Sequence, residues 1–141
     1  MARITRSQLI SQPVEQVFRV VIDGANFARW NPTVRMSRLL TDGPIGEGTR
    51  FEWKLKGFGL VTQELQEFEP NKRVRIVPLI KTLGGGHRFI FHGQGQTTRI
   101  DHELELIPRG VFKLAAPIMV VMGRKNLRDT ADALEHYLGD S

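Results

Sequence analysis

The sequence predicts an α+β fold in which one antiparallel sheet wraps around a long C-terminal helix. Strand-like segments follow one another from Val34 to Leu106 with no helical pattern between them, and one long apolar stripe at helical spacing then runs from Phe112 to Leu138. A doubly wound sheet would need helices between its strands. With 141 residues, we expect a single ligand-binding domain over residues 1–141, with a cavity between sheet and helix.

The chain is expected to begin with a strand and two short helices. Arg3 to Ile10 predicts the strand, and Pro13 opens a helix over Val14 to Ile22, whose apolar residues recur at helical spacing. A second short helix should then carry Phe27 and Trp30. We expect the Trp30 side chain mainly to fill space between the helices, and otherwise to wall one end of the cavity.

Six more strands are predicted, each ended by turn residues. Charged and apolar residues alternate strictly from Arg50, which indicates a strand with one buried and one solvent-exposed face. Gly84-Gly85-Gly86 precedes a strand rather than a helix, so we expect a flexible loop at the cavity rim instead of a phosphate loop. The segments are Val34–Leu40, one from Arg50, Leu60–Phe68, Val74–Val77, His87–His92 and Thr98–Leu106.

The last helix is predicted to present one continuous stripe to the sheet, and Pro117 should either kink it or mark its true start. The stripe comprises Phe112, Ala115, Ala116, Met119, Met122, Gly123, Asn126, Leu127, Thr130, Leu134, Tyr137 and Leu138.

Composition narrows the possible functions. The net charge is +5, but the basic residues are scattered and no aromatic ladder accompanies them, so nucleic-acid binding is not favoured. The chain has no cysteine, which excludes disulfides and thiolate chemistry and suits a cytoplasmic protein. No signal peptide is recognisable, and the longest apolar stretch, Leu114 to Met122, is too short for a membrane span. The protein is expected to be a monomer or a homodimer.

Several motifs occur in an order that resembles the START-like helix-grip superfamily (SRPBCC), in its polyketide cyclase/dehydrase and lipid-transport branch. The resemblance implies a seven-stranded antiparallel sheet gripping a long C-terminal helix over a hydrophobic cavity. Members include lipid carriers, aromatic cyclases and co-chaperones, so function is implied only broadly. The motifs are Ser11 to Phe18, Asp23, Phe27, Trp30-Asn31-Pro32, Gly46-x-Gly48-x-x-Phe51, Glu67 to Pro70 and Asn126-Leu127.

Two histidines are the candidate catalytic residues. If Gln94-Gly95 forms a two-residue hairpin turn, His87 lies directly opposite His102, and both face the cavity among apolar neighbours. Such a pair can be satisfied core histidines, can orient a polar ligand group, or can act as acid and base. No metal site or cofactor is expected, because three convergent ligands are lacking. The full set of expected ligand-binding residues is Trp30, Phe51, Trp53, Phe58, His87, Phe89, Phe91, His102, Leu104, Met119, Met122 and Asn126.

The leading hypothesis is therefore a non-catalytic protein that binds, and in one version transports, a hydrophobic or aromatic molecule, lipid-like or polyketide-like. The first alternative is a cyclase, dehydratase or isomerase that uses His87 or His102, which the absence of an inward carboxylate disfavours. The second alternative is a protein-interaction module that docks through basic residues on the outer face of the sheet. Those residues are Arg50, Lys54, Lys56, Arg73 and Arg75.

Overall fold

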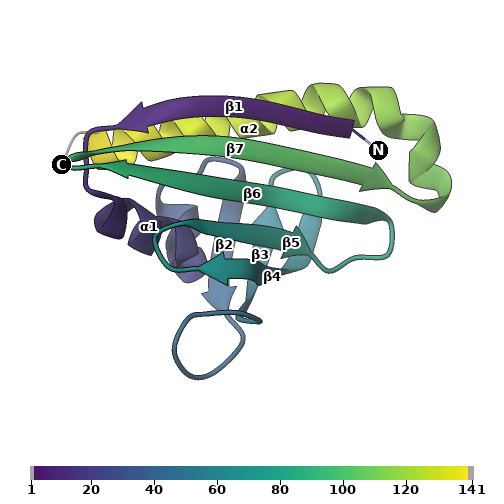
Figure 1. Cartoon of the computed structure of the whole chain (residues 1–141). Coiled ribbons are helices and arrows are strands. Elements are labelled where there is room, and N and C mark those ends of the chain that lie inside the picture. Colours follow the sequence, from purple (N-terminus) through teal and green to yellow (C-terminus); the bar gives the residue numbers. More distant parts are fainter. Residues whose placement is uncertain (1, 140–141) are drawn as a thin grey trace.

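The computed structural model describes residues 2–139, and it confirms the predicted helix-grip architecture. One antiparallel sheet has the strand order β1-β7-β6-β5-β4-β3-β2, so β1 and β2 are its two edges (Figure 1). The strands are β1 (Ala2–Ile10), β2 (Val34–Leu39), β3 (Arg50–Leu55), β4 (Gly59–Glu69), β5 (Arg73–Pro78), β6 (Leu83–Gln94) and β7 (Thr97–Pro108).

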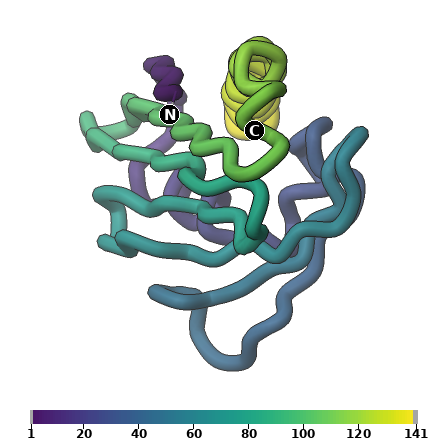
Figure 2. Tube along the Cα trace, turned by 90° about the vertical axis from the view of Figure 1, so that its right-hand side faces the viewer, coloured from purple at the N-terminus to yellow at the C-terminus, as the bar shows by residue number. Residues whose placement is uncertain are grey.

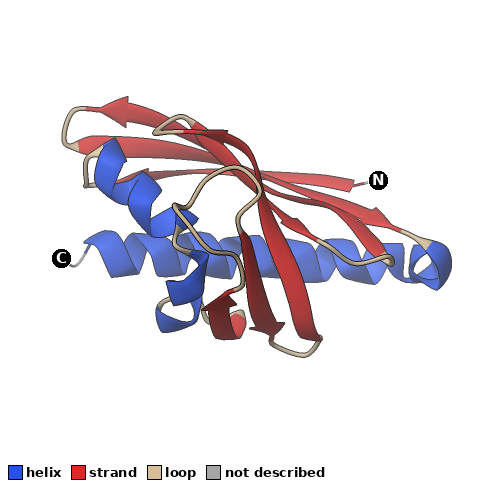
Figure 3. Ribbon diagram, turned by 90° about the horizontal axis from the view of Figure 1, so that it is seen from below, coloured by secondary structure: helices blue, strands red, loops and turns tan. Residues whose placement is uncertain are grey.

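Two short helices and one long helix cover the concave face of the sheet. Helix α1 (Val14–Ile22) and the 3₁₀ helix η1 (Gly24–Arg29) follow β1, as predicted. A second 3₁₀ helix, η2 (Gly110–Ala115), leads into α2 (Ala116–Gly139), so Pro117 lies in the first turn and marks the start of the helix. Figure 3 shows α1 and η1 beside the second half of α2, while the first half runs along the strands without another helix beside it until η2.

The main core lies between the sheet, α1, η1 and the end of α2. Its aromatic rings pack against one another: Phe27 stacks on Trp53 with ring centroids 4.6 Å apart, and Trp30 packs against Phe27 at 4.7 Å. Phe18 meets Phe91 edge to face at 5.2 Å. Pairs of this kind stabilise the fold beyond the area that they bury. This end of the concave face is therefore filled by the protein's own side chains.

The first half of α2 packs far more thinly. The helix lies over β1 and β7, beside the edge of the sheet (Figure 2). A separate small cluster of Leu104, Leu106 and Leu127 joins it to the sheet. Gly123 permits the close approach, because a Cβ atom there would lie 2.7 Å from the Leu106 side chain. Before Leu127, Gly123 is the one buried residue among the described positions of α2.

Two details of the predicted helix stripe and glycine loop are wrong. Met122 and Asn126 are exposed instead of facing the sheet, because the buried positions of α2 follow Gly123 and Leu127 around the helix. Gly84-Gly85-Gly86 is part of β6 and pairs with β7, so it is not a flexible loop. Gly85 has a φ of +99°, and a Cβ atom there would lie 2.2 Å from the Glu105 carbonyl oxygen. Glycine is thus required for two backbones to approach closely.

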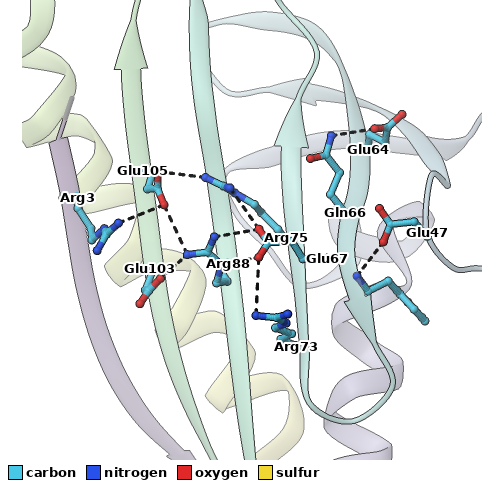
Figure 4. A network of polar contacts seen from close by, with 11 residues as sticks. Arg3, Glu47, Glu64, Gln66, Glu67, Arg73, Arg75, Arg88, Glu103 and Glu105 are labelled. Carbon is cyan, nitrogen blue, oxygen red and sulfur yellow. Dashed lines mark hydrogen bonds and ion pairs between the residues drawn. The ribbon is translucent and has the colours of Figure 1, made fainter.

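The outer face of the sheet carries a network of ion pairs (Figure 4). Glu67 adopts a φ of 50° at an irregularity in β4, and its carboxylate lies 2.9 Å from Arg88 and 3.2 Å from Arg75. Arg88 also contacts Glu103 at 2.6 Å, and Arg75 contacts Glu105 at 3.1 Å. The hydrogen bond from Arg88 holds the pKa of Glu67 below its usual value. Neighbouring strands β4 to β7 are thereby joined across their solvent side.

Candidate functional site

A chain of hydrogen bonds crosses the concave face from β6 to α2. His87 Nε2 lies 2.8 Å from His102 Nδ1, and His102 Nε2 lies 2.5 Å from the Gln8 side-chain oxygen. Gln8 Nε2 donates to the backbone carbonyl of Ala131 at 2.8 Å. Three adjacent strands and the long helix therefore share one polar relay.

The relay fixes the position of every proton in it. The Ala131 carbonyl can only accept, so the Gln8 amide group must face it, and the Gln8 oxygen must face His102. His102 then carries its proton on Nε2. Its Nδ1 therefore accepts a hydrogen bond from His87 Nε2–H. In the neutral His87 ring, Nδ1 is consequently an acceptor. It has no donor among residues 2–139.

Burial keeps both imidazoles neutral near pH 7. The pKa of His102, a residue with 1% of its surface exposed, is lowered to about 4, chiefly by burial and also by the nearby Arg6. The pKa of His87 falls well below its usual value because of burial and the neighbouring His102. Both shifts oppose a charged ring, which agrees with the proton positions that the relay imposes.

His87 lies where the aromatic core meets the thin leucine cluster. Its ring stacks on Phe89 at 4.0 Å and 11°, and it pairs with Leu104 on β7. Phe89 is completely buried, whereas His87 retains some accessible surface. The free acceptor therefore belongs to the more accessible member of the pair.

The predicted hairpin register is wrong by two residues. The turn residues are Gly95 and Gln96, and the strand pairs are Phe89 with His102 and His87 with Leu104. A shift of two residues preserves the face on which each side chain lies. The two histidines still meet, as diagonal rather than directly opposite neighbours.

The expected ligand-binding residues fall into three groups. Trp30, Phe51, Trp53, Phe89, Phe91 and Leu104 are buried in the two core clusters. Met119 is half-buried on α2, and the two histidines form the relay. Phe58, with 52% of its surface exposed on the β3–β4 turn, lies outside the relay, as do the exposed residues Met122 and Asn126.

Sequence reasoning did not identify Gln8, which orients the relay. The available signal was its position: Gln8 lies on the same side of β1 as Ile4 and Ile10, two inward-facing apolar residues. A polar side chain at such a position needs a buried partner.

Besides His87 Nδ1, the indole N–H of Trp30 also lacks a hydrogen-bond partner among the described residues. This Nε1–H is buried, although 9% of the residue surface remains exposed. The ring stacks near Tyr137 of α2, with centroids 6.3 Å apart. A buried donor without a partner costs free energy unless water or a ligand satisfies it.

Open hollows lie at the surface of the part of the chain that the structure describes, and two of them border β1. One, of about 500 Å³, lies over the β1–β7 pair beside Ser7 and Asp101, and the other, of about 760 Å³, lies between β1 and α2. The first is also lined by His102 of the relay, and neither is lined by the phenylalanine and tryptophan residues expected for a hydrophobic cavity. Those rings pack against one another instead.

Residues 2–139 contain no cluster of three histidine or carboxylate side chains able to hold a metal ion. Over the same residues, no helix combines the length and apolar character that crossing a membrane requires.

Fold and sequence together define the family. A family model described as polyketide cyclase / dehydrase and lipid transport matches residues 1–139. The chain therefore belongs to this family, and the resemblance recognised from the motifs is confirmed. A search of curated proteins finds no sequence match.

Solved structures share the fold at low sequence identity. A START superfamily protein from Mycobacterium smegmatis is 15% identical, with 96% of each chain covered and a TM-score of 0.78. The di-domain ARO/CYC protein BexL is 18% identical over 96% of this chain and 46% of its own, with a TM-score of 0.77. The Zhui aromatase/cyclase from a Streptomyces species is 12% identical over 97% and 93% of the two chains, with a TM-score of 0.75. These similarities establish the START-like fold.

Proposed function

We propose that this protein binds a hydrophobic or aromatic small molecule that carries a hydroxyl group. The observation that supports this proposal is the relay, which ends in a neutral His87 whose Nδ1 accepts a hydrogen bond but has no donor among the described residues. A hydroxyl or phenol supplies such a donor. Phe89 and Leu104 beside His87 favour an apolar body next to that group. Lipid-like and polyketide-like molecules, the classes expected from the sequence, both include members of this kind.

The ligand would lie between the sheet and the first half of α2. Gly123 faces this region from the helix, with the half-buried Met119 one turn before it, and Leu104 and Leu106 face it from the sheet. Only a small cluster fixes the helix there, so a modest outward movement would expose apolar area at a small cost. Each Å² of apolar surface that the ligand then buries contributes roughly 25 cal/mol.

Matched probes test the predicted hydroxyl contact. Calorimetry should show that 2-naphthol binds about tenfold more tightly than 2-methoxynaphthalene, which has the same rings but no donor. In His87→Phe, which keeps a ring on Phe89, the two probes should bind alike. His92→Phe, on the outer face beside Asp101, is the matched control and should retain the difference. Equal binding of both probes to the wild-type protein, or no binding of either, would contradict the proposal.

The catalytic alternative receives less support. A general base works best with a pKa near the working pH, whereas burial lowers the pKa of both histidines. The partner of His102 Nε2 is also a neutral amide, Gln8, rather than a carboxylate. A cyclase or dehydratase would be indicated by turnover of an enolisable polyketide analogue that His87→Phe abolishes.

The docking alternative is weakened by ion pairing on the outer face. Arg50 lies 2.9 Å from Glu64, Arg73 lies 3.2 Å from Glu69, and Arg75 contacts two glutamates. These carboxylates reduce the positive potential that an acidic partner would need. A cytoplasmic location and a monomeric or dimeric state remain predictions.

A further inference from the structure

Helix α2 has a second apolar face, which is directed away from the sheet. Its buried positions, such as Gly123 and Leu127, lie on one side of the helix. Ile118, Val121 and Met122, at three- and four-residue spacing, lie on the other side and are all more than 60% exposed. Val111 and Leu114 on η2 are 75% and 88% exposed. We call these five residues the outer apolar patch.

The segment that carries this patch is basic. The segment from Leu106 to Arg128 contains no aspartate or glutamate. Its basic residues lie before, within and after the outer apolar patch in sequence: Arg109, Lys113, Arg124, Lys125 and Arg128. The five charges equal the net charge of +5 of the whole chain, so the excess charge is concentrated here.

A basic groove borders the patch on the side of β1. It has a volume of about 760 Å³ and shares Val121 with the outer apolar patch. Arg124 and Lys125 line it and form no ion pair with any described residue. The groove is lined by Arg3, Ile4, Thr5, Arg6, Val121, Arg124, Lys125, Leu127 and Arg128.

We propose that η2 and the first half of α2 dock on an anionic membrane surface. The outer apolar patch enters the boundary between headgroups and acyl chains, and Arg124 and Lys125 in the groove bind lipid phosphate. No helix in residues 2–139 is suited to span a bilayer, so the segment lies in the plane of the interface. A second copy of the chain fits this face poorly, because a symmetric contact would bring the two basic segments together.

This docking does not depend on the proposed ligand, because it rests on exposed residues of η2 and α2 and on none of the relay residues. It does place the membrane against the half of α2 that is most weakly attached to the sheet. A hydrophobic molecule moving under that half of the helix would then pass directly between protein and bilayer.

Co-sedimentation with phosphatidylcholine vesicles, with and without 30% phosphatidylglycerol, tests the proposal. Binding should require the anionic lipid and weaken strongly between 50 and 500 mM salt. Each cation near the surface contributes about fivefold to partitioning, so Arg124→Gln/Lys125→Gln should lower it roughly 30-fold. Leu114→Asp/Ile118→Asp should abolish it, and these exposed positions allow the variant to fold.

Leu9→Asp is the matched control. Leu9 is also exposed, at 59%, but it pairs with Arg99 at the end of β1 remote from η2, so Leu9→Asp should bind vesicles nearly as the wild type does. Failure to bind anionic vesicles, or equal losses in Leu9→Asp and Leu114→Asp/Ile118→Asp, would overturn the proposal. A wild-type dimer in sedimentation equilibrium would also overturn it if Leu114→Asp/Ile118→Asp were monomeric and Leu9→Asp still dimeric. The outer apolar patch would then be an interface between two copies of the chain. Naphthol binding by the patch variant reports separately on the proposed ligand site.

Discussion

Acidification from pH 7 to pH 5 should destabilise the fold, and His102 should account for much of the effect. An unfolded histidine titrates near pH 6.5, whereas the pKa of folded His102 is about 4. Between these values the unfolded chain binds more protons than the folded chain, so stability falls as the pH falls. For these two pKa values, linkage gives a loss of about 2 kcal/mol between pH 7 and pH 5. His87, whose pKa is also lowered, acts in the same direction.

Urea denaturation at the two pH values measures this loss. With a denaturant slope of 1–3 kcal/mol per molar, the midpoint should fall by about 1 M at pH 5. The carboxylates of the outer network contribute little in this window, because their unfolded forms titrate near pH 4. His102→Gln should lose most of this pH dependence, even if its stability at pH 7 differs from that of the wild type. His92→Gln, which also removes one histidine, is the control and should keep the pH dependence. An unchanged midpoint in the wild type, or full pH dependence in His102→Gln, would refute the reasoning.

Three further predictions concern packing, charge and backbone, each measured by urea denaturation. Trp30→Ala should cost about 3–5 kcal/mol, because the ring packs on Phe27 and Tyr137; wild-type stability with loss of ligand would instead assign Trp30 to the pocket. Arg88→Met should cost about 2 kcal/mol of stability, because Glu67 and Glu103 lose a shared cation, whereas Arg38→Met at an exposed pair should cost less than about 1 kcal/mol. Equal losses would mean that the network adds no stability beyond that of an exposed ion pair. Gly85→Ala should cost at least about 3 kcal/mol through its clash with Glu105, whereas Gly43→Ala, with open space around it, should cost about 1 kcal/mol; similar values would contradict the close-approach argument.

The sequence predicted the architecture well, because most of the elements have strong local signals. Strict alternation from Arg50 predicts a strand with one buried face, and helical spacing in Val14–Ile22 predicts a helix with one buried stripe. The structure has both. The extent of β6 was missed, because Gly84-Gly85-Gly86 resembles a loop by composition and pairs only through tertiary contact with β7. The face of α2 was mistaken at Met122 for a related reason: the helix is apolar on two sides, and periodicity alone does not tell which side meets the sheet.

The candidate site was predictable only in part. His87 and His102 were identified because both alternate with apolar residues, and that face was correct despite the shifted register. Gln8 lies 94 residues from His102 in the chain, and only the pairing of β1 with β7 brings the two together. The orientation of the relay depends on Ala131 as well, a backbone group that no side-chain pattern marks.

The relay and the outer apolar patch meet in α2, where they impose different requirements on its two halves. The second half must remain fixed, because Ala131 accepts the bond that orients Gln8, and Leu134 and Leu138 are buried in the main core. The first half has only Gly123 and the small leucine cluster to hold it. Movement there would open space between the helix and the leucines of β7 without disturbing the proton positions that the second half maintains. Hydrogen exchange should therefore be much faster in residues 116–122 than in residues 130–138, and anionic vesicles should slow exchange in the first half alone.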